Sequence, residues 1–81
     1  MRKPIVGGNW KMNTTEAEAG ALARDVVAAT LGTKADVAVC VPFPHLAVVR
    51  TAVHGTHVGA GAQDVYWEAK GAFTGEVSAA M

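Results

Sequence analysis

The chain has 81 residues, a formal net charge of zero and 51% hydrophobic residues. This balance is typical of a globular protein and argues against a disordered tail or a nucleic-acid-binding protein. No run approaches the ~18 apolar residues of a membrane span, and Asn9 and Lys11 interrupt the apolar run that a signal peptide needs. The lone Cys40 forms no disulfide within the chain, and no spacing matches a metal site. We therefore expect a cytoplasmic protein without metal or other cofactor.

The first predicted element is a strand over residues 5–11. Strand side chains alternate between faces, so Asn9 and Lys11 should point one way and Trp10 the other. The two glycines before them leave room for another backbone or a ligand. Lys11 suits an anion such as phosphate, and Asn9 adds an amide donor and acceptor. From the residues alone, the alternative is a buried strand whose last polar side chains meet water.

An amphipathic helix and a buried strand are predicted next. Thr15 and Glu18 form the signature of a capping box, and Gly32 is expected to cap the other end of the helix. The helical spacing of three and four residues is kept by the apolar residues Ala19, Leu22, Ala23, Val26 and Val27. The apolar run over residues 37–41 then predicts a parallel strand buried on both faces.

The remaining segments predict a second helix, a third strand and a long loop. Pro44 suits the first turn of a helix that ends at residues 54–55, and residues 58–63 form a strand of small residues. Residues 64–76 are a loop of functional length, which either exposes an aromatic interaction patch or folds back on its own core. Residues 77–81 resemble the opening turn of a third helix. Surface or capping positions are expected for the three histidines, His45, His54 and His57.

Four stretches of the sequence resemble the triosephosphate isomerase family. They are residues 8–13 (GNWKMN), 41–44 (VPFP), 61–64 (GAQD) and 71–78 (GAFTGEVS). The resemblance implies an α/β fold, the N-terminal portion (βαβαβ plus long loop) of a (β/α)8 TIM barrel. Residues 1–81 would then be part of a single domain with no internal boundary. Because such a barrel needs about 250 residues, we expect the chain to be incomplete without a complementary C-terminal chain.

The resemblance also implies an activity. The family is an isomerase of glycolysis and gluconeogenesis that interconverts dihydroxyacetone phosphate and glyceraldehyde 3-phosphate through an enediolate. Lys11 would be catalytic, and Asn9 and Lys11 would bind the triose phosphate substrate. The family takes its histidine and glutamate for proton transfer from after the fourth and sixth strands, so the isolated chain is expected to be inactive.

A second, homologous subunit is the other implied partner, bound through the loop over residues 64–76. Thr74 would approach the Asn9 and Lys11 region of that subunit, and Glu76 would pair with a basic residue farther along. The residues implied at this subunit interface are Met12, Asn13, Phe73, Thr74, Gly75 and Glu76. The alternative is a non-catalytic fragment or assembly module that pairs through its strand edges and the same loop. A βαβ piece of another fold is disfavoured by the motif matches.

Overall fold

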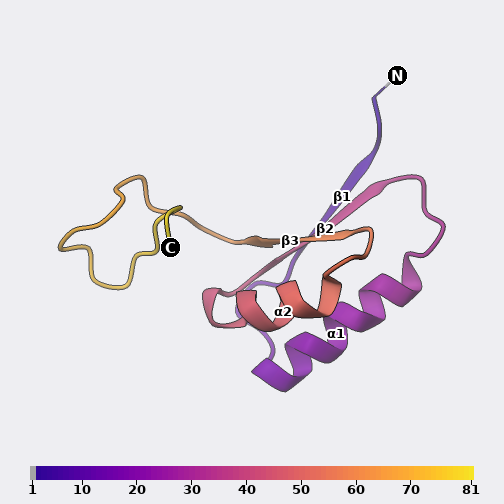
Figure 1. Cartoon of the computed structure of the whole chain (residues 1–81), viewed down its shortest axis with the longest axis horizontal. Coiled ribbons are helices and arrows are strands. Elements are labelled where there is room, and N and C mark those ends of the chain that lie inside the picture. The colour runs from indigo at the N-terminus through magenta and orange to yellow at the C-terminus, as the bar shows by residue number, and fades with distance from the viewer. Residues whose placement is uncertain (1) are drawn as a thin grey trace.

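The computed structural model describes residues 2–81, which form a parallel sheet with both helices on one side of it (Figure 1). The strands β1 (Ile5–Asn9), β2 (Asp36–Val41) and β3 (Val58–Ala62) pair in the order β1-β2-β3. Helix α1 (Glu16–Ala29) connects β1 to β2, and a 3-10 turn (Phe43–His45) with helix α2 (Leu46–Val53) connects β2 to β3. The predicted βαβαβ order, with β1 and β3 as the outer strands, is confirmed.

The N-terminus of α1 has the predicted capping box. Thr15 Oγ1 accepts from the Glu18 amide at 3.4 Å, and Glu18 Oε1 accepts from the Thr15 amide at 2.8 Å. These bonds satisfy N–H groups that the first helical turn leaves unpaired. The prediction that Gly32 caps the other end is wrong. Thr30 is the C-cap, because its N–H and its hydroxyl both donate to the carbonyl of Val26, and Gly32 lies in the turn beyond with φ 79°.

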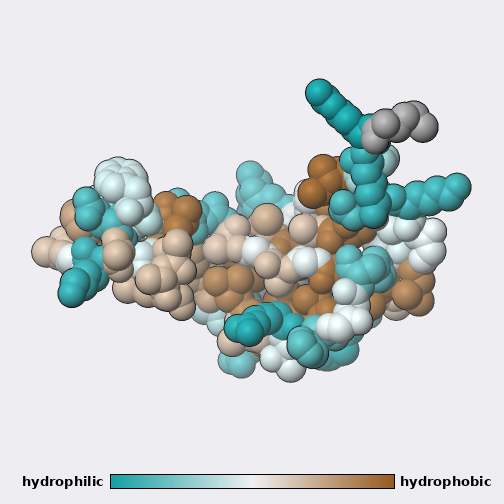
Figure 2. All heavy atoms as spheres, turned by 45° about the horizontal axis from the view of Figure 1, so that its top comes forward, coloured by the Kyte–Doolittle hydropathy of each residue, from teal (hydrophilic) through white to brown (hydrophobic). Residues whose placement is uncertain are grey.

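The core lies between the helices and one face of the sheet. Its buried side chains are small, which lets α1 and α2 approach the strands closely. They are Ala19, Ala23, Val39, Val41, Val49, Val53 and Val58. Within residues 2–81 no helix covers the opposite face (Figure 1), where a Cβ on Gly59 or Gly61 would meet only atoms of β2 within 4 Å, the nearest being Ala38 Cβ at 3.8 Å and Cys40 Sγ at 3.7 Å. Figure 2 shows hydrophobic residues open on the surface, and Ile5 and Val6 of β1 are 72% and 58% exposed.

The loop over residues 64–76 projects away from the sheet and helices (Figure 1). It contains no helix or strand, as predicted. Its base is closed where the Tyr66 amide donates to the carbonyl of Val77 at 2.8 Å, beside a bridge between Tyr66 and Ser78. The predicted third helix does not extend beyond an opening turn, and residues 77–81 form no helix. After Ser78 the chain makes a single turn, with the Met81 amide on the carbonyl of Ser78, because so few residues cannot offset the cost of nucleating a helix.

Candidate active site

The carboxyl ends of the strands meet at one edge of the sheet. The parallel register places Asn9, Cys40 and Gly61 in one row across β1, β2 and β3. Asn9 is the last residue of β1, so its side chain lies at this edge. In barrels of parallel strands and helices, ligands bind at the carboxyl ends of the strands. The edge is therefore the candidate site.

Lys11 reaches this edge by a different backbone path from the one the sequence predicts. β1 ends at Asn9, not at residue 11, and Lys11 has a left-handed backbone with φ 58°. Strand alternation therefore does not extend to Lys11, and that part of the prediction is wrong. Instead, the Lys11 amide donates to Asn9 Oδ1 at 2.9 Å. This bond uses one lone pair of Asn9 Oδ1 and leaves the Nδ2 group as a donor for a ligand. Trp10 packs against the helix-side core, as expected.

Gln63 holds the same edge together from the end of β3. Its Nε2 donates to the carbonyl of Lys11 at 2.9 Å and to that of Cys40 at 3.1 Å. The side chain therefore joins the ends of β2 and β3 to the segment that follows β1. Sequence reasoning placed Gln63 inside the third strand and assigned it no role. The available signal was a polar side chain at the end of a strand of small residues.

His45 is a second residue that sequence reasoning missed. It is half-buried, and its Nε2 lies 3.0 Å from the carbonyl oxygen of Thr14. Since a carbonyl only accepts, Nε2 carries the hydrogen. The expectation of a surface or capping position is met by His45 in place only: it is the N-cap residue of α2, but its side chain makes no capping bond. The expectation is right for His54, the exposed C-cap of α2, and for His57, which is exposed beside Thr30 Oγ1.

The residues implied at a subunit interface fall into two groups. Met12 is 94% exposed, and Asn13 closes its turn by donating from Nδ2 to the carbonyl of Trp10 at 2.7 Å. The second group, Phe73, Thr74, Gly75 and Glu76, forms a tight turn in which the Glu76 amide donates to the carbonyl of Phe73 at 3.0 Å. Gly75 has φ 89° there, a conformation that favours glycine. The interface itself stays a prediction.

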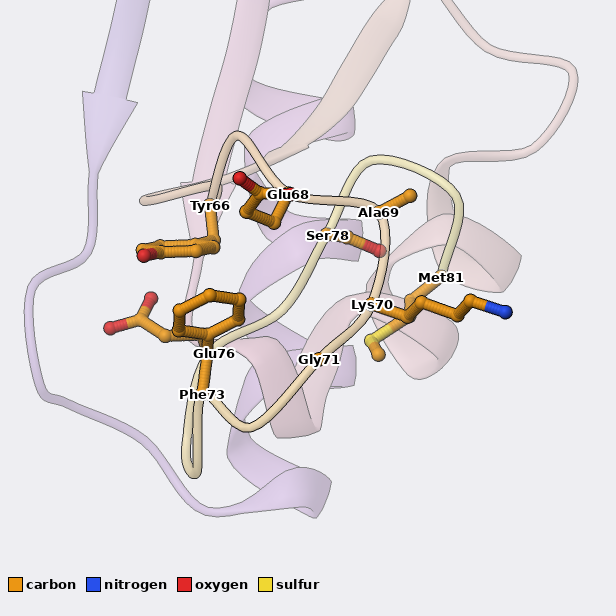
Figure 3. A pocket seen from close by; sticks show the side chains of 9 residues that line it. All are labelled: Tyr66, Glu68, Ala69, Lys70, Gly71, Phe73, Glu76, Ser78 and Met81. Atoms are coloured by element: carbon orange, nitrogen blue, oxygen red, sulfur yellow. The ribbon is translucent and has the colours of Figure 1, made fainter.

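The projecting loop is organised around its own aromatic residues. The Tyr66 ring stacks on Trp67 with centroids 4.2 Å apart and lies 4.6 Å from Phe73. Figure 3 shows Tyr66 over Phe73, with the carboxylate of Glu76 pointing away from the interior. A cavity of about 40 Å³ lies beside them, while Trp67 is 82% exposed. The loop therefore packs on itself and exposes apolar surface, as one expectation had it, but it does not fold back on the core between the sheet and the helices (Figure 1).

Neither a metal-binding cluster nor a membrane-spanning helix occurs among the described residues. Within residues 2–81, no cluster of three or more His, Cys, Asp and Glu side chains could hold a metal ion. No helix in that range is long and apolar enough to cross a membrane.

Comparisons with known proteins agree with this geometry. A family model described as triosephosphate isomerase matches residues 4–81. Triosephosphate isomerases of Thermoanaerobacter pseudethanolicus, Thiobacillus denitrificans and Synechocystis sp. are 46%, 54% and 47% identical to the chain over its whole length. The chain spans about a third of the length of these curated relatives (33%, 32% and 34%). Its parallel sheet and helices match the N-terminal part of a TIM barrel. The chain therefore belongs to the triosephosphate isomerase family.

Proposed function

We propose that the chain is the N-terminal part of a triosephosphate isomerase, competent only together with the C-terminal part of the same barrel. The reaction interconverts dihydroxyacetone phosphate and glyceraldehyde 3-phosphate by moving a proton between adjacent carbons through an enediolate. The observation that carries the proposal is the pairing of Asn9 and Lys11 at the carboxyl edge of the sheet, through the 2.9 Å bond from the Lys11 amide to Asn9 Oδ1. Active sites of TIM barrels lie at this edge.

Lys11 supplies fixed positive charge in this proposal. The phosphate of the substrate brings about two negative charges at neutral pH, and the enediolate develops more on its oxygens. A preorganised cation stabilises that charge without reorganisation during the reaction. Asn9 positions the substrate by donating from Nδ2, while its Oδ1 accepts from the Lys11 amide. No metal ion or organic cofactor takes part.

Proton transfer also needs a carboxylate base and an imidazole beside the substrate oxygens. Glu68 and Glu76 belong to the loop that projects away from the sheet (Figure 1), so we assign neither of them as the base. We propose that the complementary C-terminal chain supplies both groups. Residues 1–81 would then be one portion of a single barrel domain, working in the cytoplasm.

A second subunit completes the proposal. Large apolar surfaces on a protein mark contacts with other molecules, and Met12, Trp67 and Phe73 are 94%, 82% and 41% exposed. We propose that the loop over residues 64–76 docks on a homologous subunit, with Met12, Asn13 and the turn Phe73–Glu76 at the interface. Thr74, at the tip of that turn, would approach Asn9 and Lys11 of the partner subunit.

Complementation tests this proposal. The 81-residue chain and a polypeptide that begins near the fourth strand are assayed singly and together for interconversion of the two triose phosphates. We expect no turnover from either chain alone and turnover from the mixture. Activity in the 81-residue chain alone would contradict the assignment of roles, since neither base nor imidazole is assigned to it.

The second candidate function is a non-catalytic assembly module. The outer strands β1 and β3 of the sheet and the exposed Trp67 favour it, because unpaired strand edges readily pair with another chain. The same experiment separates the two functions. A mixture that forms a stable complex, measured by sedimentation, but shows no turnover would favour the module.

A further inference from the structure

The segment between β1 and α1 contains two residues in an unfavourable backbone conformation. Lys11 has φ 58° and Thr14 has φ 78°. A left-handed backbone is a genuine outlier for a β-branched residue such as Thr14. Such conformations persist only where the surrounding structure holds them in place.

Each of the two residues is held by a side chain that comes from elsewhere in the fold. The carbonyl of Lys11 accepts from Gln63 Nε2 at 2.9 Å, and the carbonyl of Thr14 accepts from His45 Nε2 at 3.0 Å. The His45 bond is partly buried, so water competes with it less than at an exposed site. Among the described residues, Thr14 Oγ1 and His45 Nδ1 are buried without a hydrogen-bond partner. The bond from His45 Nε2 to the carbonyl oxygen of Thr14 is therefore the hydrogen bond that joins these two residues.

We propose that His45 is a positioning residue for Lys11, acting through the carbonyl of Thr14; this inference rests on the proposed function. The segment over residues 10–14 has fixed ends, because Asn9 belongs to the sheet and Thr15 caps α1. A change of φ at Thr14 must therefore be compensated between these ends, where Lys11 lies. By holding Thr14, His45 keeps Lys11 in the conformation that presents it to the phosphate.

A capping role does not explain this arrangement. His45 occupies the N-cap position of α2, yet its side chain makes no capping hydrogen bond there. Its ring instead reaches a residue 31 positions earlier in the chain.

Two substitutions that differ by one methylene test the position of the donor. In His45→Gln the amide nitrogen can take the place of Nε2, whereas in His45→Asn it lies nearer the place of Nδ1. Both are measured in the barrel assembled with the complementary chain, as kcat, KM and the inhibition constant for inorganic phosphate. We expect His45→Asn to raise KM and the inhibition constant about tenfold, with a smaller change in kcat, as for a loss of ground-state binding. His45→Gln should stay within about threefold of the unsubstituted chain, and so should the control His54→Asn at the exposed end of α2.

The outcomes separate this inference from the proposed function. Equal effects of His45→Asn and His45→Gln would overturn it, and so would a lower melting temperature with an unchanged inhibition constant per assembled barrel. If the unsubstituted assembly shows no turnover, the proposed function fails. Hydrogen exchange in the 81-residue chain then decides the structural claim: His45→Asn should speed exchange of the Lys11 amide, which donates to Asn9 Oδ1, about tenfold, and His45→Gln should not. Unchanged exchange in His45→Asn would overturn it.

Discussion

Gln63 Nε2 donates to the carbonyl oxygen of Lys11 over 2.9 Å, and this bond ties the residue after β3 to the segment after β1. The same nitrogen lies 3.1 Å from the carbonyl of Cys40 at the end of β2. One amide group therefore holds together the edge at which Asn9 and Lys11 lie.

The first prediction removes this group. Gln63→Met keeps the length of the side chain and deletes its donors. The hydrogen bond to the Lys11 carbonyl is exposed, so water can replace part of it. We therefore expect the free energy of unfolding to fall by about 1 kcal/mol. If displacement of Lys11 costs the transition state the same amount, kcat/KM of the assembled enzyme falls roughly fivefold. Enzyme kinetics and a urea melt measure the two effects. Glu68→Gln, in the projecting loop, is the control, and an unchanged kcat/KM in Gln63→Met would show that the bond does not matter for Lys11.

The second prediction concerns the pH dependence of stability at the start of α1. The Thr15 amide, and then the Thr15 hydroxyl, lower the pKa of Glu18 below its ordinary value of 4.5. Because the pKa of Glu18 is lower in the folded state, its carboxylate stabilises the folded state above pH 4.5. This stabilisation is lost as the pH falls through the lowered pKa. Glu18→Gln keeps an oxygen acceptor but cannot titrate. The difference in unfolding free energy between the unsubstituted chain and this variant should therefore shrink on acidification, as measured by urea melts at several pH values.

Glu16→Gln is the matched control, because Glu16 lies in the same turn and makes no capping bond with Thr15. A difference for Glu18→Gln that stayed constant with pH would mean that the carboxylate does not stabilise the helix through its charge.

Local sequence patterns were sufficient for most of the fold. The capping box needs only Thr15 and Glu18, three residues apart, and the apolar run around Val39 is typical of a buried parallel strand wherever it occurs. The end of β1 was less predictable, because the chain leaves the sheet after Asn9 and Lys11 has a left-handed backbone that no alternation pattern contains.

The site was predictable only in part. The residue types of Asn9 and Lys11, with the resemblance, indicated a phosphate site, although the geometric argument for their common face was wrong. The side chains that hold this segment were not predictable locally: Gln63 and His45 lie 52 and 31 positions from the carbonyls that they bind. Such contacts arise only when the sheet brings the ends of its strands together.

The third prediction tests the aromatic packing of the projecting loop. Gly71 has φ 146°, and a Cβ there would lie 2.7 Å from Cε2 of Phe73. Gly71→Ala should therefore displace the Phe73 ring from Tyr66 and reduce the near-ultraviolet circular dichroism of the loop. The sheet and helices should keep their far-ultraviolet signal, because the loop projects away from them (Figure 1). Ala72→Ser, at the next exposed position, is the control. An unaltered near-ultraviolet spectrum in Gly71→Ala would contradict the packing.

The last prediction concerns the charge of Lys11 in the assembled enzyme. Lys11→Met keeps most of the stem and deletes the ammonium, so the fold should persist. A donor aimed at developing charge typically supplies about 3–4 kcal/mol, so we expect at least about a hundredfold loss of kcat/KM. Lys11→Arg should rescue poorly, because its planar fork does not replace a compact ammonium. Trp10→Phe is the control: Trp10 packs against the core, so its loss should affect the melting temperature more than the rate. If Lys11→Met assembled normally and its kcat/KM stayed within a few-fold, Lys11 would be only a solvated residue after a strand, and the proposed role of the Asn9–Lys11 pair would be wrong.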